Sequence, residues 1–110
     1  AVAMAYAEGL AESSLILPHV PDWAEPAWHL YVVRTPDRDR LQGRLSEAGI
    51  GTLIHYPIPP HMQKAYANTK ILSEAFPLAR DLASEVLSLP IGPQLGLVQV
   101  QDIVNALKNA

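Results

Sequence analysis

The spacing of the prolines limits how long any helix or strand in this chain can be. Proline has no backbone N–H to donate, and it disrupts both the interior of a helix and the middle of a sheet. The chain has ten of them: Pro18, Pro21, Pro26, Pro36, Pro57, Pro59, Pro60, Pro77, Pro90 and Pro93. These positions predict short helices and strands joined by stiff loops.

The apolar pattern between the prolines predicts helices alternating with strands. Apolar residues recur every three or four positions in the expected helices, and β-branched and aromatic residues fill the expected strands. Helices are expected over residues 2–11, 36–48, 61–67, 77–85 and 97–107, and strands over 15–17, 28–34, 50–56 and 86–89. This order predicts one α/β (α+β sandwich) domain over residues 1–110, in which helices cover a small mixed or mostly antiparallel sheet of three or four strands.

One expected helix carries signals for both of its ends. Thr35 is the expected N-cap, and Pro36 suits the first helical position. Leu41 and Leu45 give this helix a buried stripe. We expect Gly49 to end it in the left-handed conformation that glycine adopts after a helix.

The composition disfavours several classes of function. The 110 residues carry a formal net charge of −3, which disfavours nucleic-acid binding through a basic patch. The chain has no cysteine, which excludes disulfides and thiolate sites and fits a cytoplasmic protein. No apolar run approaches the ~20 residues of a membrane-spanning helix, so we expect no membrane partner.

Residues 49–66 contain polar side chains that core packing does not explain. A strand is expected to carry His55 and Tyr56 to its end, and the prolines that follow restrict where His61 and Gln63 can point. Imidazole, phenol and amide groups all hydrogen-bond sugar hydroxyls, and ligand contacts tend to lie on loops of this kind. The alternative is that His55 is an ordinary satisfied polar residue and Tyr56 a packing residue with its hydroxyl in water.

The histidines could also indicate zinc, but their spacing is unfavourable. His55 and His61 lie on either side of a proline loop rather than one helical turn apart, and no third ligand is apparent. His19 and His29 are isolated in the sequence. We therefore expect no metal site.

Four strings in order resemble one family of enzymes. The string IHYPIPPHMQKAY, preceded by GIGT, resembles the DegT/StrS family of sugar-nucleotide aminotransferases, which depend on pyridoxal phosphate. The strings AWHLYVVR, FPLARDLASEVLSLPIGP and QVQDIVNAL resemble the same family, at residues 27–34, 76–93 and 99–107. The first string is most similar to members that aminate the 3-keto position of dTDP-linked 6-deoxy sugars.

The resemblance implies two domains with different roles. Family members have fold type I, with a large domain and a small C-terminal α/β domain, and this chain resembles only the small one. The large domain carries the lysine that forms a Schiff base with pyridoxal phosphate, and Lys64, Lys70 and Lys108 lie in no string resembling that region. The resemblance therefore implies pyridoxal phosphate in the whole enzyme, but no catalytic residue and no bound cofactor in this chain alone.

The resemblance also implies roles for the polar segment. His55 and Tyr56 match family residues that approach the hexose of the nucleotide sugar, and His61 and Gln63 match the same segment. His29 matches a position near the domain interface. The implied substrate is a nucleotide-linked keto-sugar, aminated from glutamate for lipopolysaccharide O-antigen, surface glycans or antibiotics. The implied partners are the large domain and the second subunit of a homodimer.

Three interpretations stay open from the sequence. The chain begins within an expected helix, which indicates a fragment of an aminotransferase. A second interpretation is a free-standing, non-catalytic binding or dimerisation module derived from the small domain. A third is an unrelated α+β regulatory domain that binds a metabolite.

Overall fold

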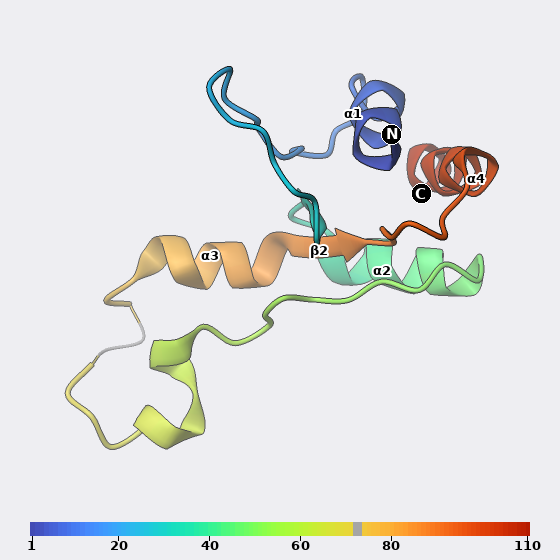
Figure 1. The fold of residues 1–110 in the computed structure, drawn as a ribbon. Coiled ribbons are helices and arrows are strands. Elements are labelled where there is room, and N and C mark those ends of the chain that lie inside the picture. The colour runs from blue at the N-terminus through green and yellow to red at the C-terminus, as the bar shows by residue number, and fades with distance from the viewer. Residues whose placement is uncertain (72–73) are drawn as a thin grey trace.

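The computed structural model describes residues 1–71 and 74–110, and it shows helices packed on a small antiparallel sheet (Figure 1). The helices are α1 (Val2–Gly9), α2 (Arg38–Glu47), α3 (Pro77–Glu85) and α4 (Leu97–Asn109), with two 3-10 helices, η1 (Pro60–Met62) and η2 (Lys64–Tyr66). The strands are β1 (Tyr31–Arg34) and β2 (Val86–Leu89). The predicted fold class is confirmed.

The two strands pair antiparallel and give the sheet two different faces. Val33 lies opposite Leu87, and Val32 lies opposite Ser88. Because side chains alternate along a strand, Val33 and Leu87 point to one face of the sheet, and Val32 and Ser88 point to the other. Val33 and Leu87 are fully buried. The sheet therefore has a core face and a second face, to which Ser88 belongs.

Two further segments join this sheet through one bridge each. Ile16 pairs with Arg34 at one edge, and Leu53 pairs with Ser88 at the other. The prediction of three or four regular strands is therefore wrong for the described residues: the segments 15–17 and 50–56 contribute a single bridge apiece. The expected strand 28–34 is also regular only from Tyr31 onward. The physical reason is that prolines close to these segments leave room for little pairing.

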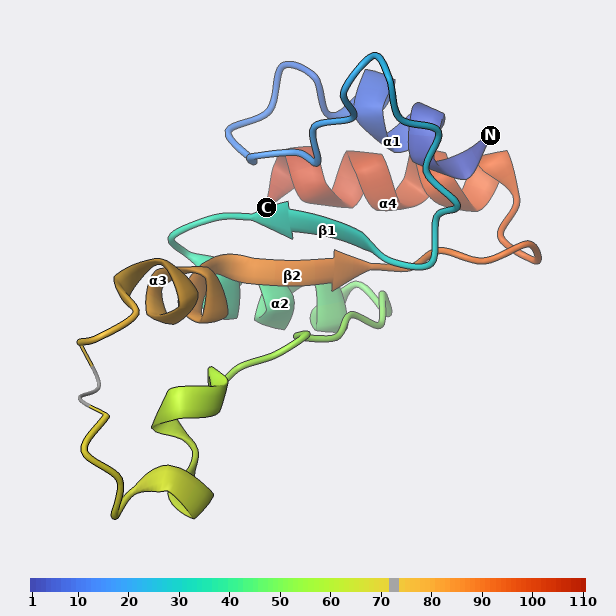
Figure 2. The same ribbon diagram turned by 60° about the vertical axis from the view of Figure 1, so that its left-hand side comes forward.

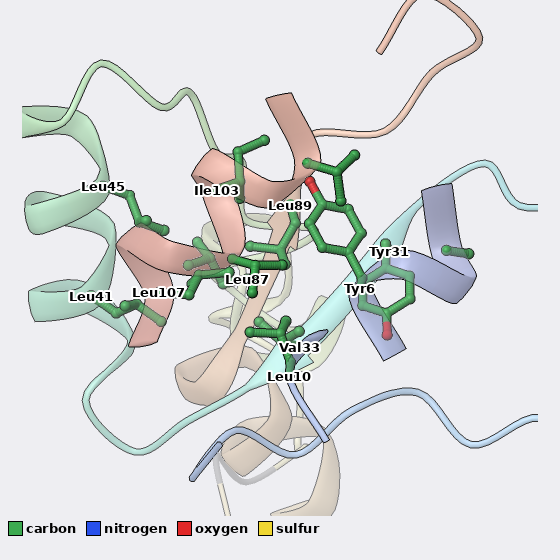
Figure 3. Packing of buried hydrophobic residues seen from close by; sticks show 13 residues of the cluster. Tyr6, Leu10, Tyr31, Val33, Leu41, Leu45, Leu87, Leu89, Ile103 and Leu107 are labelled. Carbon is green, nitrogen blue, oxygen red and sulfur yellow. The ribbon is translucent and has the colours of Figure 1, made fainter. Parts of the chain in front are cut away.

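The core lies where three helices meet the core face of the sheet. α1 and α4 lie side by side over the strands, and α2 contacts both β2 and α4 (Figure 2). The buried cluster, drawn in Figure 3, consists of Ala3, Tyr6, Leu10, Tyr31, Val33, Leu41, Leu45, Leu87, Leu89, Val100, Ile103, Val104 and Leu107. The predicted stripe of α2 is confirmed, because Leu41 and Leu45 both belong to this cluster. Each fully buried leucine contributes about 1.5–3 kcal/mol through the hydrophobic effect.

Gly49 ends α2 as predicted. Its φ of 76° lies in the left-handed region. Its N–H donates to the Ser46 carbonyl at 3.0 Å, and the Ile50 N–H donates to the Leu45 carbonyl at 2.8 Å. This pair of bonds is the Schellman motif, and Ile50 packs against the core beyond it.

The start of α2 differs from the prediction. The helix begins at Arg38 with Asp37 as its N-cap residue, so Thr35 is not the cap and Pro36 is not in the first helical position. Thr35 Oγ1 instead accepts a hydrogen bond from the Asp37 N–H at 3.4 Å. The hydroxyl thus stabilises a turn before the helix rather than its first turn.

Residues 56–71 form an arm that leaves the body of the domain below β2 (Figures 1 and 2). The radius of gyration is 15.7 Å, against about 13 Å for a compact domain of this length. The arm is therefore not folded back onto the core. The helix expected over residues 61–67 is replaced here by η1 and η2. Within the described ranges, no helix has the length and apolar character needed to cross a membrane.

Candidate functional site

His55 reaches the second face of the sheet because of the bridge two residues before it. The Leu53 N–H donates to the Ser88 carbonyl at 3.3 Å, and the Ser88 N–H donates to the Leu53 carbonyl at 2.8 Å. Side chains alternate between the two faces of the sheet along this extended segment. Ile54 therefore points toward the core and packs against it, and His55 points to the face that carries Ser88. The His55 Nδ1 atom lies 2.9 Å from Ser88 Oγ.

Tyr56 lies directly beside His55, at the start of the arm. The peptide bond between the two residues is cis, and their rings meet edge to face with centroids 5.4 Å apart. His55 is half-buried, whereas Tyr56 is 72% exposed. Of the predicted pair, His55 is thus held on the sheet, and the ring of the neighbouring Tyr56 is exposed.

The other two predicted site residues lie farther along the arm. His61, in η1, packs its ring edge-to-face against Phe76, with centroids 5.1 Å apart. Gln63 is exposed, and its N–H donates to the Pro60 carbonyl at 3.3 Å. Neither His61 nor Gln63 lines the hollows beside His55.

His55 lies between two open hollows that are both lined mainly by apolar surface. The first, of about 300 Å³, also has polar groups from His29, Thr52, His55 and Ser88. The second, of about 270 Å³, has apolar groups beside His55, including Tyr56, Pro59 and Leu82. A ligand bound at His55 would therefore meet a few polar groups on a mainly apolar surface.

The sequence does not single out two polar residues of the first hollow as site residues. His29 is isolated in the sequence, but antiparallel pairing of β1 with β2 brings it next to the residues that follow β2. Ser88 lies in the expected strand over residues 86–89, with no role predicted for its hydroxyl. Its signal was available in the string LSLP, where a hydroxyl interrupts a buried apolar run.

A larger hollow of about 490 Å³ lies elsewhere, between the loop after α1, the start of α2 and the end of α4. Its lining carries charges of both signs, with Glu12 and Asp37 alongside Arg40 and Lys108. This mixture selects no particular ligand charge. We therefore place the candidate site at His55 rather than at this larger hollow.

The lysines of this chain lie away from the candidate site. Lys64, Lys70 and Lys108 all have exposed side chains, and none lines the hollows beside His55. The zinc alternative gains no support, because no three histidine, cysteine, aspartate or glutamate side chains of the described ranges gather around one point.

Comparisons with known proteins give consistent similarities. The pattern of the DegT/DnrJ/EryC1/StrS aminotransferase family matches residues 1–108. The erythromycin biosynthesis sensory transduction protein EryC1 of Saccharopolyspora erythraea is 48% identical over 94 residues, which cover 86% of this chain and 26% of that protein. The dTDP-3-amino-3,6-dideoxy-alpha-D-galactopyranose transaminase of Aneurinibacillus thermoaerophilus is 43% identical over 106 residues, covering 96% of this chain and 29% of that protein.

The fold is similar to that of a solved enzyme. The crystal structure of Streptomyces venezuelae DesV, in complex with a ketimine intermediate, matches 98% of this chain with a TM-score of 0.93 and 40% sequence identity. The match covers 29% of the DesV chain. The chain therefore spans less than a third of the length of the relatives it matches.

Proposed function

This chain belongs to the DegT/DnrJ/EryC1/StrS aminotransferase family, and we propose that it is the C-terminal small domain of an enzyme that aminates a nucleotide-linked keto-sugar. The observation that carries this proposal is the 43% identity, over 96% of the chain, to a transaminase named for a dTDP-linked 3-amino sugar. The short share of each relative that the chain covers supports a domain of a longer enzyme over a free-standing module.

The proposed substrate is a dTDP-linked 6-deoxyhexose with a ketone at C3. The amino donor is glutamate, whose Cα is oxidised to the ketone of 2-oxoglutarate while C3 of the sugar is reduced to an amine-bearing carbon. Pyridoxal phosphate, bound to a lysine in the rest of the enzyme, supplies the electron sink. The product would enter the synthesis of lipopolysaccharide O-antigen, another surface glycan or an antibiotic.

The proposed role of this domain is to bind the hexose. His55 offers a ring nitrogen held on the sheet, and Tyr56 offers an exposed hydroxyl beside it. The prolines that follow stiffen the backbone, which lowers the entropy cost of presenting these groups. We assign His61 and Gln63 to the same substrate-facing segment, on the stretch of arm that begins with Tyr56.

The partners proposed are the large domain of the enzyme and a second subunit. The arm and α3 expose apolar side chains that a free domain would leave in water: Tyr56, Ile58, Met62, Tyr66, Ile71, Phe76 and Leu78. Exposed apolar patches of this kind mark interaction surfaces. We propose a cytoplasmic location, which the cysteine-free composition of this chain fits.

The test is amination by the intact enzyme. The purified protein, loaded with pyridoxal phosphate, is incubated with glutamate and dTDP-3-keto-6-deoxyglucose, and the products are identified by mass spectrometry. We expect a dTDP-3-amino sugar and 2-oxoglutarate in equal amounts. The dTDP-4-keto isomer is the matched control, and faster amination of that isomer would contradict the assigned position. Failure to aminate any keto-sugar, together with a reading frame that encodes only this chain, would favour the non-catalytic module.

A further inference from the structure

Ser88 lies in an environment where a serine is not expected. It lies between Leu87 and Leu89 in β2, and only 4% of its surface is exposed. Alanine or valine would fill such a position without burying a hydroxyl, which costs free energy unless it is hydrogen-bonded. Among the described residues, His55 is the partner recorded for this hydroxyl, at 2.9 Å.

The backbone and the side chain of Ser88 hold the neighbouring segment in different ways. Its N–H and carbonyl pair with Leu53, which places the segment along the edge of the sheet. Its hydroxyl meets Nδ1 of His55, which determines how the imidazole ring is turned. A change to alanine would remove the second contact and keep the first.

The contact also determines which nitrogen of His55 carries the proton. If Nδ1 donated to Ser88 Oγ, the buried hydroxyl hydrogen would have no acceptor of its own among the described residues, at an energetic cost. If the hydroxyl donates to Nδ1, both groups are satisfied, and Nε2 carries the proton of the neutral ring. The hydrogen-bond partner of Nδ1 thus determines whether Nε2 carries a proton that it can donate.

We propose that Ser88 is a positioning residue, which holds His55 in one orientation and one tautomer so that Nε2–H donates a hydrogen bond to an oxygen of the bound sugar. This inference rests on the proposed function, because it gives His55 a direction toward the hexose. Ser88 itself touches neither substrate nor cofactor in this scheme. It acts through His55, from the buried side of the 300 Å³ hollow that both residues line.

The first measurement tests the contact without any substrate. The chain is labelled with 15N-histidine, and the His55 ring signals are assigned by comparison with the His55→Gln variant. We expect the wild-type shifts to show an unprotonated Nδ1 and a protonated Nε2. Ser88→Ala should shift both signals toward the average of exchanging tautomers, and Ser88→Thr, which keeps the hydroxyl, should restore them. Wild-type shifts in Ser88→Ala would overturn the proposal.

The second measurement tests the consequence in the intact enzyme. We expect Ser88→Ala to lower kcat/KM for the keto-sugar about three- to tenfold, with the reaction of glutamate unchanged and with Ser88→Thr close to wild type. If His55→Ala impairs the sugar reaction and Ser88→Ala does not, the positioning role is overturned while the proposed function stands. If neither substitution affects the sugar reaction, the proposed sugar contact fails, and this inference fails with it.

Discussion

The Tyr6 hydroxyl in α1 donates a hydrogen bond to the Pro90 carbonyl, 2.8 Å away and just beyond β2. The two residues are 84 positions apart in the chain, so this bond ties the first helix to the end of the last strand. The Tyr6 side chain is fully buried, and its ring lies 5.0 Å from that of Tyr31. Burial, with a smaller contribution from Tyr31, raises the pKa of Tyr6 to about 12.

Tyr6→Phe should therefore change both the stability and its dependence on pH. At neutral pH we expect a loss of about 1 kcal/mol, because the Pro90 carbonyl loses its donor. The pKa of Tyr6 is higher in the folded protein than in the unfolded chain, and this difference stabilises the fold below pH 10. The stabilisation is lost as the pH rises from 10 to 12, since the tyrosine of the unfolded chain ionises first. Over that range the wild type should lose roughly 2–3 kcal/mol relative to Tyr6→Phe, which exceeds its advantage at neutral pH, so the variant should be the more stable protein at pH 12.

Urea unfolding of both proteins at intervals from pH 7 to 12 measures this difference. Tyr31, whose pKa is also raised by burial, is retained in both proteins, so its own burial cancels in the difference and only its smaller electrostatic interaction with Tyr6 remains. A constant gap between the two proteins across the range would contradict the assigned pKa.

Gly9→Ala should destabilise the domain, although alanine is the better helix former. A Cβ at this position would lie 3.0 Å from both methyl carbons of Val104, which is almost fully buried in α4. Overpacking of this kind costs about 1–3 kcal/mol. Thermal unfolding of a double-mutant cycle with Val104→Ala checks the cause, because the smaller side chain should remove the penalty. An equal penalty in both backgrounds would point to another origin.

Two glycines of the same region should respond to alanine in opposite directions. Gly43 lies inside α2 with open space around it, so Gly43→Ala should stabilise the domain by about 0.5–1 kcal/mol. Gly49 also has open space, but its φ of 76° is unfavourable for a residue with a Cβ. Gly49→Ala should cost about 1–2 kcal/mol. If the urea midpoints of Gly43→Ala and Gly49→Ala move in the same direction, the φ of Gly49 does not determine how its stability responds to alanine.

His55→Ala in the intact enzyme should slow the reaction with the keto-sugar and leave the reaction with the amino donor near normal. Loss of the proposed hydrogen bond to the hexose is expected to cost roughly 1–3 kcal/mol, or about five- to 150-fold in kcat/KM for the keto-sugar. The reaction with glutamate does not involve the sugar and should stay near normal. Single-turnover kinetics of the two half-reactions separate the effects. If both fall equally, His55 is a structural or cofactor-site residue.

The chain alone should self-associate through its arm and α3. Phe76 and Leu78 are 53% and 68% exposed and form an apolar surface with their neighbours. Leu78→Glu should weaken the association by placing a charge in that contact. The matched control is Val98→Glu, on α4 across the sheet, where a valine is 77% exposed. Sedimentation velocity over a wide concentration range measures both, and a strictly monomeric wild type would contradict the expectation.

Local sequence signals determined most of the helices, although not every helix end. Leu41 and Leu45 follow the helical period, and Gly49 supplies the left-handed residue that stops α2. Pro77 opens α3 as predicted. These features depend on residues within one or two turns of each other, so the sequence by itself contains the physical information that they need.

The strand lengths and the composition of the site depended on tertiary structure. A segment forms a regular strand only where a partner strand pairs with several of its residues. The local sequence does not show that Leu53 pairs with Ser88 through a single bridge. The same long-range pairing brings His29 and Ser88 to His55. The sequence determined that residues 55 and 56 carry polar groups at the start of a stiff loop. Only the packing of the strands decided which other side chains surround them, because those contacts join residues far apart in the chain.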